Sequence, residues 1–116
     1  MTIAANSFNN LVVDGNTGTK TLAGAIDVDG DLTLTNNGGG LLDVSGSDYG
    51  INLAGTWTNN GTFTAQSGTV TLDGASDQAI SGSSSTTFYN LTNSNSATTV
   101  TSVSYTHLTL PTILLV

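Results

Sequence analysis

The stretch GTWTNNGTFTAQSGTVTLDG, residues 55–74, alternates apolar and polar side chains in short runs that Gly and Asn separate. Alternation with a period of two is typical of a strand that buries one face. Val70 and Leu72 are therefore expected to point inward, while the residues beside them face water. Further strands are predicted over 30–35, 49–55, 60–65 and 68–74. Gly and Asn between the runs indicate tight turns, because both tolerate positive φ values.

The composition also indicates an all-β protein. The chain has 116 residues, of which 37% are hydrophobic and 14 are glycine, and this length fits one domain or part of one. Thr and Val are plentiful, whereas the helix formers Glu, Lys, Arg and Gln are nearly absent. No apolar spacing of helical period extends over eleven or more positions.

The charges narrow the possible partners. Eight acidic residues, all of them Asp, face a single basic one, Lys20, and the formal net charge is −7. A chain with so few cations cannot replace the counterions of nucleic acid, and it has nothing to attract an anionic membrane surface. No run is long enough for a transmembrane helix, and the absence of cysteine removes disulfides and thiolate metal sites.

Internal repetition points to a β-solenoid. GDLTL at 30–34 returns as GTFTA at 61–65, and a longer echo, at an offset of 80, links Phe8 to Phe88. A period near 30 built from short strands and Gly-rich turns predicts stacked coils, whose inward side chains form continuous ladders. The residues expected to point inward are Leu11, Val13, Leu22, Ile26, Val28, Leu32, Leu34, Leu42, Val44, Ile51, Leu53, Phe63, Val70, Leu72, Ile80 and Leu91.

An antiparallel β-sandwich is the competing architecture. Asn60-Gly61, between Thr58 and Thr62, is typical of a two-residue hairpin turn and favours local antiparallel pairing. The repetition has no reason to exist in such a fold, so the solenoid is the preferred prediction.

The C-terminal segment differs in composition from the rest of the chain, since it carries the only His and the only Pro. Residues 103–112 can be back-translated into a nucleotide string that resembles one reading frame of the transposon-end adapter used in sequencing libraries. We therefore expect residues 1–102 to be a solenoid segment truncated at one or both ends, and 103–116 to be a non-native tail. His107, the only histidine, would then have no biological role. The alternative is a genuine apolar strand over 108–116.

The repeats resemble those of secreted bacterial surface proteins. FNNLVV at 8–13, GTVTLDG at 68–74, the step Gln78-x-Ile80-x-Gly82 and TFYNLT at 87–92 are similar to repeat regions of adhesin-like and autotransporter-passenger-like proteins. The similarity covers about residues 7–101. It implies a right-handed parallel β-helix, an extracellular or cell-surface location, and a structural or adhesive role. Neighbouring repeats and extracellular glycan or protein surfaces would be its partners.

Two groups of residues are candidate binding sites. Asp27, Asp29 and Asp31 alternate along one predicted strand, and their carboxylates are the ligands that Ca²⁺ prefers, although a solvated acidic face explains them as well. Trp57, with Tyr49 and Tyr89, is a candidate platform for stacking on sugar rings, and burial of Trp57 in the core is the alternative.

Catalysis is not expected from these residues. Paired Asp side chains serve as acid and base in glycosidases, but such sites need surroundings that separate the two pKa values. With no Arg, one Lys and no native His expected, the chain offers little for that purpose. A calcium-dependent carbohydrate-binding module is the alternative function, and part of a polysaccharide-cleaving β-helix enzyme is a further one.

Overall fold

The computed structural model describes residues 1–14, 16, 18–37, 41–96, 100–102, 108–109 and 112–115. Side chains are described as far as Thr101, and beyond it only the backbone is. The described residues form strands and turns, and no helix lies among them that could cross a membrane.

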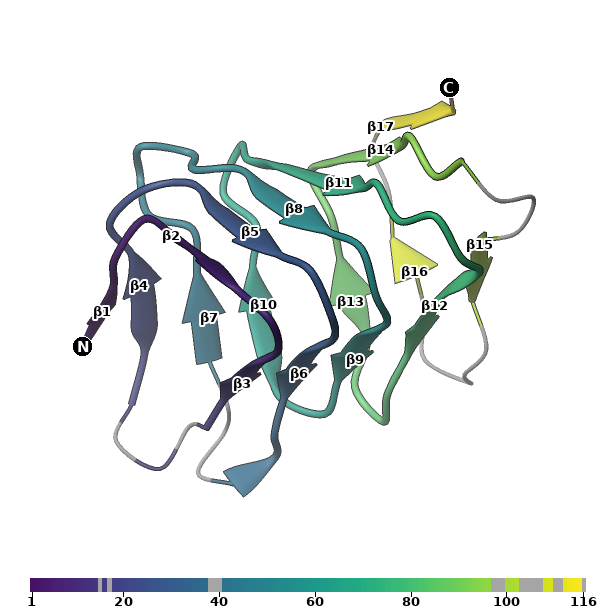
Figure 1. The fold of residues 1–116 in the computed structure, drawn as a ribbon. Helices are drawn as coiled ribbons and strands as arrows, with labels where there is room; N and C mark the ends of the chain where they lie inside the picture. The colour runs from purple at the N-terminus through teal and green to yellow at the C-terminus, as the bar shows by residue number, and fades with distance from the viewer. Residues whose placement is uncertain are drawn as a thin grey trace.

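The strands form three long faces and one short one (Figure 1). The first face contains β1 (Thr2–Ile3), β4 (Lys20–Leu22), β7 (Leu41–Asp43) and β10 (Thr62–Thr64). The second contains β2 (Asn6–Phe8), β5 (Ile26–Val28), β8 (Ile51–Leu53), β11 (Thr69–Leu72), β14 (Asn90–Asn93) and β17 (Thr112–Leu115). The third contains β3 (Leu11–Val13), β6 (Leu32–Leu34), β9 (Trp57–Asn59), β12 (Gln78–Ser81) and β15 (Val100–Ser102). The short face contains β13 (Thr86–Thr87) and β16 (Leu108–Thr109).

Three consecutive strands make one coil, and each coil stacks on the one before it. Every strand pair is parallel and joins strands that lie three places apart along the chain, as β2 and β5 or β5 and β8 do. The result is a β-solenoid of about four turns, with an axis that runs from left to right in Figure 1. The predicted all-β fold and parallel solenoid are confirmed.

The antiparallel alternative is wrong at the turn that suggested it. β9 and β10, on either side of Asn60-Gly61, belong to different sheets and do not pair with each other. The side-chain oxygen of Asn59 accepts a hydrogen bond from the N–H of Gly61 at 2.9 Å. This local bond turns the chain onto the next face of the coil instead of folding it back on itself.

The predicted period near 30 residues is also wrong. The register pairs Ile26 with Ile51 and Ile51 with Val70, so successive coils are 25 and 19 residues long. GDLTL leads into β6 on the third face, whereas GTFTA contains β10 on the first face. The echo of Phe8 in Phe88 fails in the same way, because the residues that follow form β3 and β14 on different faces. Similar turn and strand sequences recur without occupying equivalent places in the coil.

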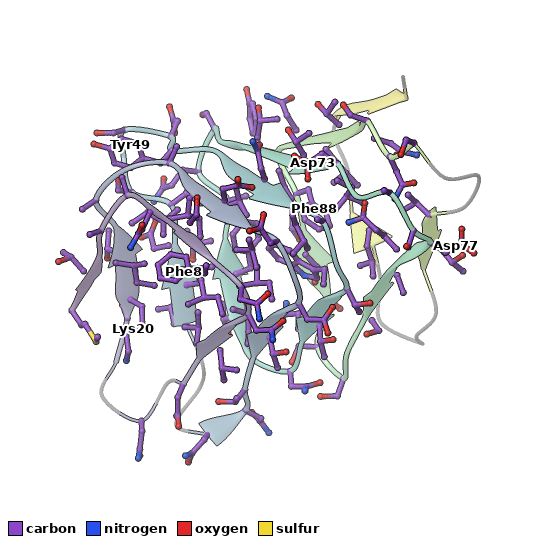
Figure 2. All side chains as sticks on the ribbon, in the orientation of Figure 1. Phe8, Lys20, Tyr49, Asp73, Asp77 and Phe88 are labelled. Carbon is purple, nitrogen blue, oxygen red and sulfur yellow. The ribbon has the colours of Figure 1, made fainter. Side chains whose placement is uncertain are left out.

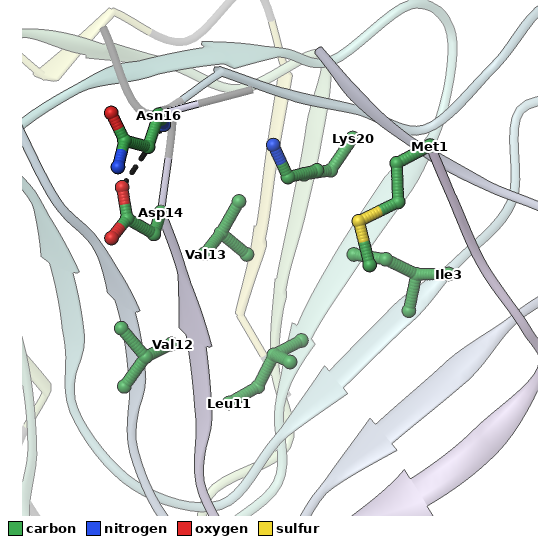
Figure 3. Close-up of a pocket in the computed structure, with 8 residues that line it drawn as sticks. All are labelled: Met1, Ile3, Leu11, Val12, Val13, Asp14, Asn16 and Lys20. Carbon is green, nitrogen blue, oxygen red and sulfur yellow. Dashed lines mark hydrogen bonds between the residues drawn. The ribbon is translucent and has the colours of Figure 1, made fainter. Parts of the chain in front are cut away.

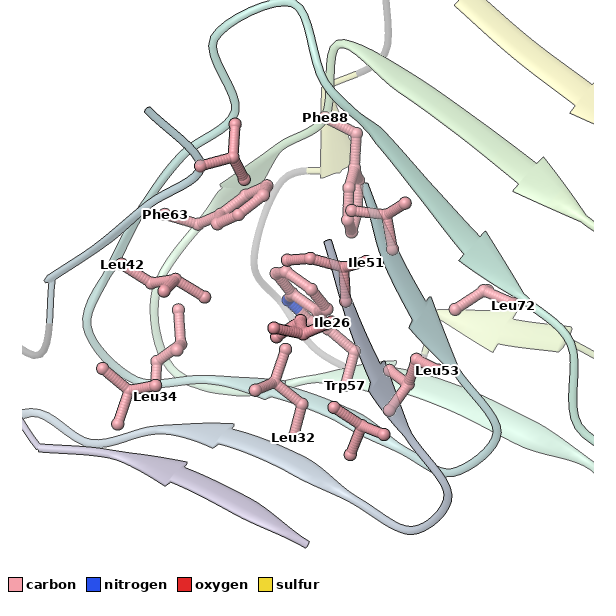
Figure 4. Close-up of a cluster of buried hydrophobic side chains, with 14 of the residues drawn as sticks. Ile26, Leu32, Leu34, Leu42, Ile51, Leu53, Trp57, Phe63, Leu72 and Phe88 are labelled. Atoms are coloured by element: carbon pink, nitrogen blue, oxygen red, sulfur yellow. The ribbon is translucent and has the colours of Figure 1, made fainter. Parts of the chain in front are cut away.

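The core lies along the axis as predicted. Of the sixteen residues expected inside, fifteen are buried and Leu11 is half-buried against the core. Trp57 and Phe88 are buried as well, and both are fully enclosed. Their rings meet Phe63 in one cluster (Figure 4), with the Trp57 and Phe63 centroids 4.8 Å apart in an edge-to-face arrangement. Edge-to-face packing is a preferred geometry for aromatic pairs.

Residues 108–109 and 112–115 continue the stacking. β16 pairs in parallel with β13, and β17 pairs in parallel with β14. The origin proposed for residues 103–116 stays a prediction, and His107 and Pro111 lie outside the described residues.

One glycine is required where two coils meet closely. Gly82 has φ +123°, and a Cβ placed on it would collide with the backbone of Asn59 on the coil below. We expect Gly82→Ala to lower the free energy of unfolding by about 1–3 kcal/mol, the usual cost of a backbone held in a strained region. Gly46→Ala is the matched control, because no atom lies within 4 Å of the added Cβ there. Urea unfolding of both variants measures the difference, and equal stabilities would contradict the close contact.

Candidate functional site

The outer surface of the coils consists of ladders of polar side chains. On the second face, the register places in one row Ser7, Asp27, Asn52, Thr71 and Thr92. The third face carries a similar row with Val12, Thr33, Thr58 and Ser81. The first face carries Thr2, Thr21, Asp43 and Thr64. Neighbouring members of a row are separated by the strand spacing of about 4.8 Å, so the polar side chains of a row, which on the third face exclude Val12, are regularly spaced along the axis.

The structure does not gather Asp27, Asp29 and Asp31 into a calcium site. Asp27 lies on β5, Asp29 follows that strand, and Asp31 stands at the next corner. The Asp31 carboxylate already accepts a hydrogen bond from the Thr56 N–H at 2.8 Å, which ties its coil to the next. Within the described ranges, no group of three or more His, Cys, Asp or Glu side chains is placed to hold a metal ion.

The pKa of the Asp73 carboxyl is raised by its surroundings. It lies on the outside of the coils (Figure 2), just after β11. Partial burial raises the pKa of its carboxyl above the usual value, and the negative charges of Asp27 and Asp29 raise it further. A backbone hydrogen bond to the carboxylate opposes these effects in part. The second face therefore concentrates negative charge without a described cation beside it.

The raised pKa of Asp73 predicts that ionisation of this carboxyl destabilises the folded chain as the pH rises. Protonation is easier in the folded chain, so the stabilisation due to this group is complete below pH 3.8 and is lost as the pH rises through the folded pKa. We expect Asp73→Asn to stabilise the protein above that range by no more than about 0.5 kcal/mol, because water screens an exposed charge. The gain should shrink toward pH 3.8. Thermal unfolding of both chains across this range tests it, and a gain that grows on acidification would contradict the sign.

The candidate aromatic platform lacks its central member, and the alternative, burial of Trp57 in the core, is confirmed. Trp57 points into the core with none of its surface exposed, since it occupies an inward position of β9. Tyr49 is half-buried against the core, and only Tyr89 presents a large exposed surface, at 45%. Tyr49 precedes β8 and Tyr89 precedes β14, with β11 between those strands. The three side chains therefore do not form one flat stacking surface.

A groove lies instead where the first face is interrupted. β10 is the last strand of its sheet, and β13 begins a separate one, so the two neighbouring strands are not joined by a ladder. A hollow of about 320 Å³ opens there. We call it the aromatic groove, and its lining residues are Phe63, Thr64, Ala65, Gln66, Thr87, Phe88 and Tyr89.

The interruption has a cause in the core beneath it. Thr86 points inward, and its hydroxyl oxygen accepts hydrogen bonds from the Trp57 indole N–H at 3.3 Å and the Asn59 amide at 3.0 Å. The Asn59 amide also donates to the carbonyl of Ser85 at 3.2 Å. These bonds hold β13 to the third face instead of to β10. Phe88 packs on Trp57 (Figure 4) and lines the groove from below.

A second hollow occupies the end of the solenoid that carries β1 and β3 (Figure 3). It measures about 330 Å³ and is lined mainly by apolar side chains. Lys20 also lines it. Lys20 is 6% exposed, and its ammonium group donates to the carbonyl of Gly18 at 2.8 Å. The only Lys or Arg of the chain is therefore withdrawn from the outer surface.

Sequence reasoning named Tyr89 but missed the rest of the groove. The signal for Phe88 was present, because TFYN follows a Gly- and Ser-rich turn, yet its neighbour Phe63 lies 25 residues away. Their proximity, with ring centroids 6.0 Å apart, depends on the length of that turn. Gln66 gave no signal at all, since an isolated Gln in a turn is ordinarily solvated.

Fold and surface together define a parallel β-solenoid that displays ladders of small polar side chains. Comparison with protein-family models, curated proteins and solved structures finds no match to this chain.

Proposed function

We propose that the chain is a structural and adhesive repeat segment of a secreted or cell-surface bacterial protein. The observation that carries this proposal is the set of outward ladders, in which Thr, Ser, Asn and Asp repeat at the strand spacing on three faces. A rigid stack holds many weak hydrogen-bonding groups in fixed register. Contacts that are weak singly then add by multivalency.

The charge distribution favours uncharged partners. All eight acidic residues lie within the described coils, whereas Lys20 is buried. A surface of this kind repels nucleic acid and anionic lipid, and it suits neutral glycans or uncharged regions of extracellular proteins. We propose a purely binding role without catalysis, because no described pair of carboxylates is accompanied by an exposed basic group.

Retention of beads that carry the full chain tests adhesion. Beads coated densely or sparsely are passed over neutral polysaccharide, mucin and fibronectin, in Ca²⁺ and in EDTA. Dense coating should raise retention per molecule by about 10²-fold or more, as multivalency requires. Beads that are retained on none of the surfaces would refute the adhesive role. Retention that EDTA abolishes would instead favour the calcium-dependent module.

A further inference from the structure

The aromatic groove combines apolar walls with polar groups at its rim. From this combination we infer that it binds one or two sugar rings of a neutral glycan, which rests on the proposed adhesive function and names its ligand. Its volume of about 320 Å³ is at the lower end of the range for small-ligand sites, about 300–1,000 Å³. That size suits one or two rings of a chain whose remaining residues extend along the surface.

Tyr89 supplies the exposed aromatic surface on which the apolar side of a sugar ring can stack. Phe63 and Phe88 are buried at 8% and 0% exposure and form a rigid floor. Tyr89 is exposed at 45% beside them, so its ring is free to stack on a ligand. Burying a preformed aromatic surface contributes area at low conformational cost, since the Tyr side chain has only two rotatable bonds.

The rim of the groove carries several hydrogen-bonding side chains. Within the described part of the chain, the hydroxyl groups of Thr64, Thr87 and Tyr89 have no hydrogen-bond partner. Gln66 is held in place, because its amide nitrogen donates to the Asp43 carboxylate at 3.0 Å. The carbonyl oxygen of that amide can then accept from a sugar hydroxyl. Several fixed polar groups around an apolar floor are what orient a ligand in a site.

Charge and geometry exclude the other common occupants. The Asp43 carboxylate beside Gln66 and the net charge of −7 repel acidic sugars and phosphates. An added peptide strand would need about twice the 4.8 Å strand spacing between its neighbours. Cα atoms of β10 and β13 already lie within 8 Å of one another, so no strand fits between them.

Titration calorimetry of the full chain tests the groove. The probes are the neutral hexasaccharides of β-1,4-glucose, β-1,4-mannose and β-1,3-glucose, with hexagalacturonate as the acidic comparison. We expect at least one neutral probe to bind with a Kd on the order of 1 mM, as befits a site filled by one or two rings. Hexagalacturonate should not bind. Binding of the acidic probe in preference, or of no neutral probe, would overturn the inference.

Three variants locate the binding. Thr87→Trp, at an exposed position of the rim, fills the groove and should weaken binding more than tenfold, and Tyr89→Ala should weaken it about fivefold. Tyr49→Ala is the matched control outside the groove and should leave the Kd within twofold. Circular dichroism confirms that each variant is folded. Unchanged affinity in both groove variants, or an equal loss in the control, would overturn the assignment.

The bead assay separates this inference from the adhesive function. If the beads adhere but the chain binds no hexasaccharide, the glycan-binding role of the aromatic groove is overturned and the adhesive function stands. Hexasaccharide binding that depends on Tyr89, together with beads that do not adhere, would support the groove and refute the adhesive role.

Discussion

Replacement of Trp57 by alanine is expected to lower the free energy of unfolding by about 3–5 kcal/mol, the usual cost of deleting a large buried aromatic side chain. Trp57 is fully buried, and its ring centroid lies 4.8 Å from that of Phe63 and 5.0 Å from that of Phe88. The substitution also removes the indole N–H that donates to Thr86. The cavity would open under the aromatic groove, so its floor would be lost with the stability.

Trp57→Phe is the informative control. A phenyl ring keeps much of the packing but loses the hydrogen bond and the volume of one ring, and Thr86 still accepts from Asn59 at 3.0 Å. We expect this variant to cost about 1–2 kcal/mol, less than half the effect of alanine. Equilibrium unfolding in urea, followed by far-ultraviolet circular dichroism, measures both. A Trp57→Ala chain within 1 kcal/mol of the parent would show that the aromatic cluster is not the centre of the core.

The inward ladders were predictable because alternation fixes which side chains share a face. Ile51 and Leu53 enclose a polar residue, and both are fully buried as expected. Trp57 obeys the same rule, since Thr stands on either side of it. The sequence alone left its role open, because an aromatic residue on a strand suits a ligand platform as well as a core. Only the position of β9 in the coil decides between them.

The length of each coil could not be predicted, because it depends on the turns. Strand sequences such as GDLTL and GTFTA look equivalent, yet they lie on different faces. They differ in the number of residues in the turns before and after them. Polar turns of different length leave little periodic pattern in the sequence. The groove shares this origin, because it exists only where the turn before β13 carries Thr86 inward.

The sequence alone also does not show which polar groups link one coil to the next. Gln78 belongs to the step Gln78-x-Ile80-x-Gly82, but the carbonyls to which its amide donates, those of Leu53 and Gly55, lie on the preceding coil. A local pattern gives the face of a side chain and not the backbone groups that meet it from the next coil. The contacts of the candidate calcium ligands were hidden in the same way, since the Asp31 carboxylate accepts from the Thr56 N–H on the next coil.

Gln78 is the buried polar side chain whose replacement tests this linkage. It is 1% exposed, and its amide nitrogen donates to the carbonyls of Leu53 and Gly55, both at 2.8 Å. Its oxygen accepts from the Gly74 N–H at 2.8 Å and the Asn95 amide at 2.6 Å. Both N–H groups and both acceptor positions are therefore used. A buried amide satisfied so completely is expensive to replace, because every partner loses its bond at once.

We expect Gln78→Glu to lower the free energy of unfolding by about 3–5 kcal/mol at pH 7, the usual cost of an uncompensated buried charge. The carboxylate can still accept from Gly74, but it faces two carbonyl oxygens without a proton to donate. Burial and these carbonyls raise the pKa of the new carboxyl in the folded chain. Its stability should therefore recover on acidification, since the protonated form donates to one carbonyl, and be lost again as the pH rises through the folded pKa.

Gln66→Glu is the comparison at an exposed turn position, where the new carboxylate loses the hydrogen bond to Asp43 and faces its charge in water. Water screens this contact, so the loss should stay within about 1 kcal/mol. Each variant is compared with the parent at the same pH, which cancels the titration of the eight native Asp residues. Equal stabilities for the two Glu variants at pH 7 would mean that water reaches residue 78 and that the amide does not join the coils. A deficit that stays constant between pH 7 and pH 4 would mean that lost packing, and not the buried charge, causes it.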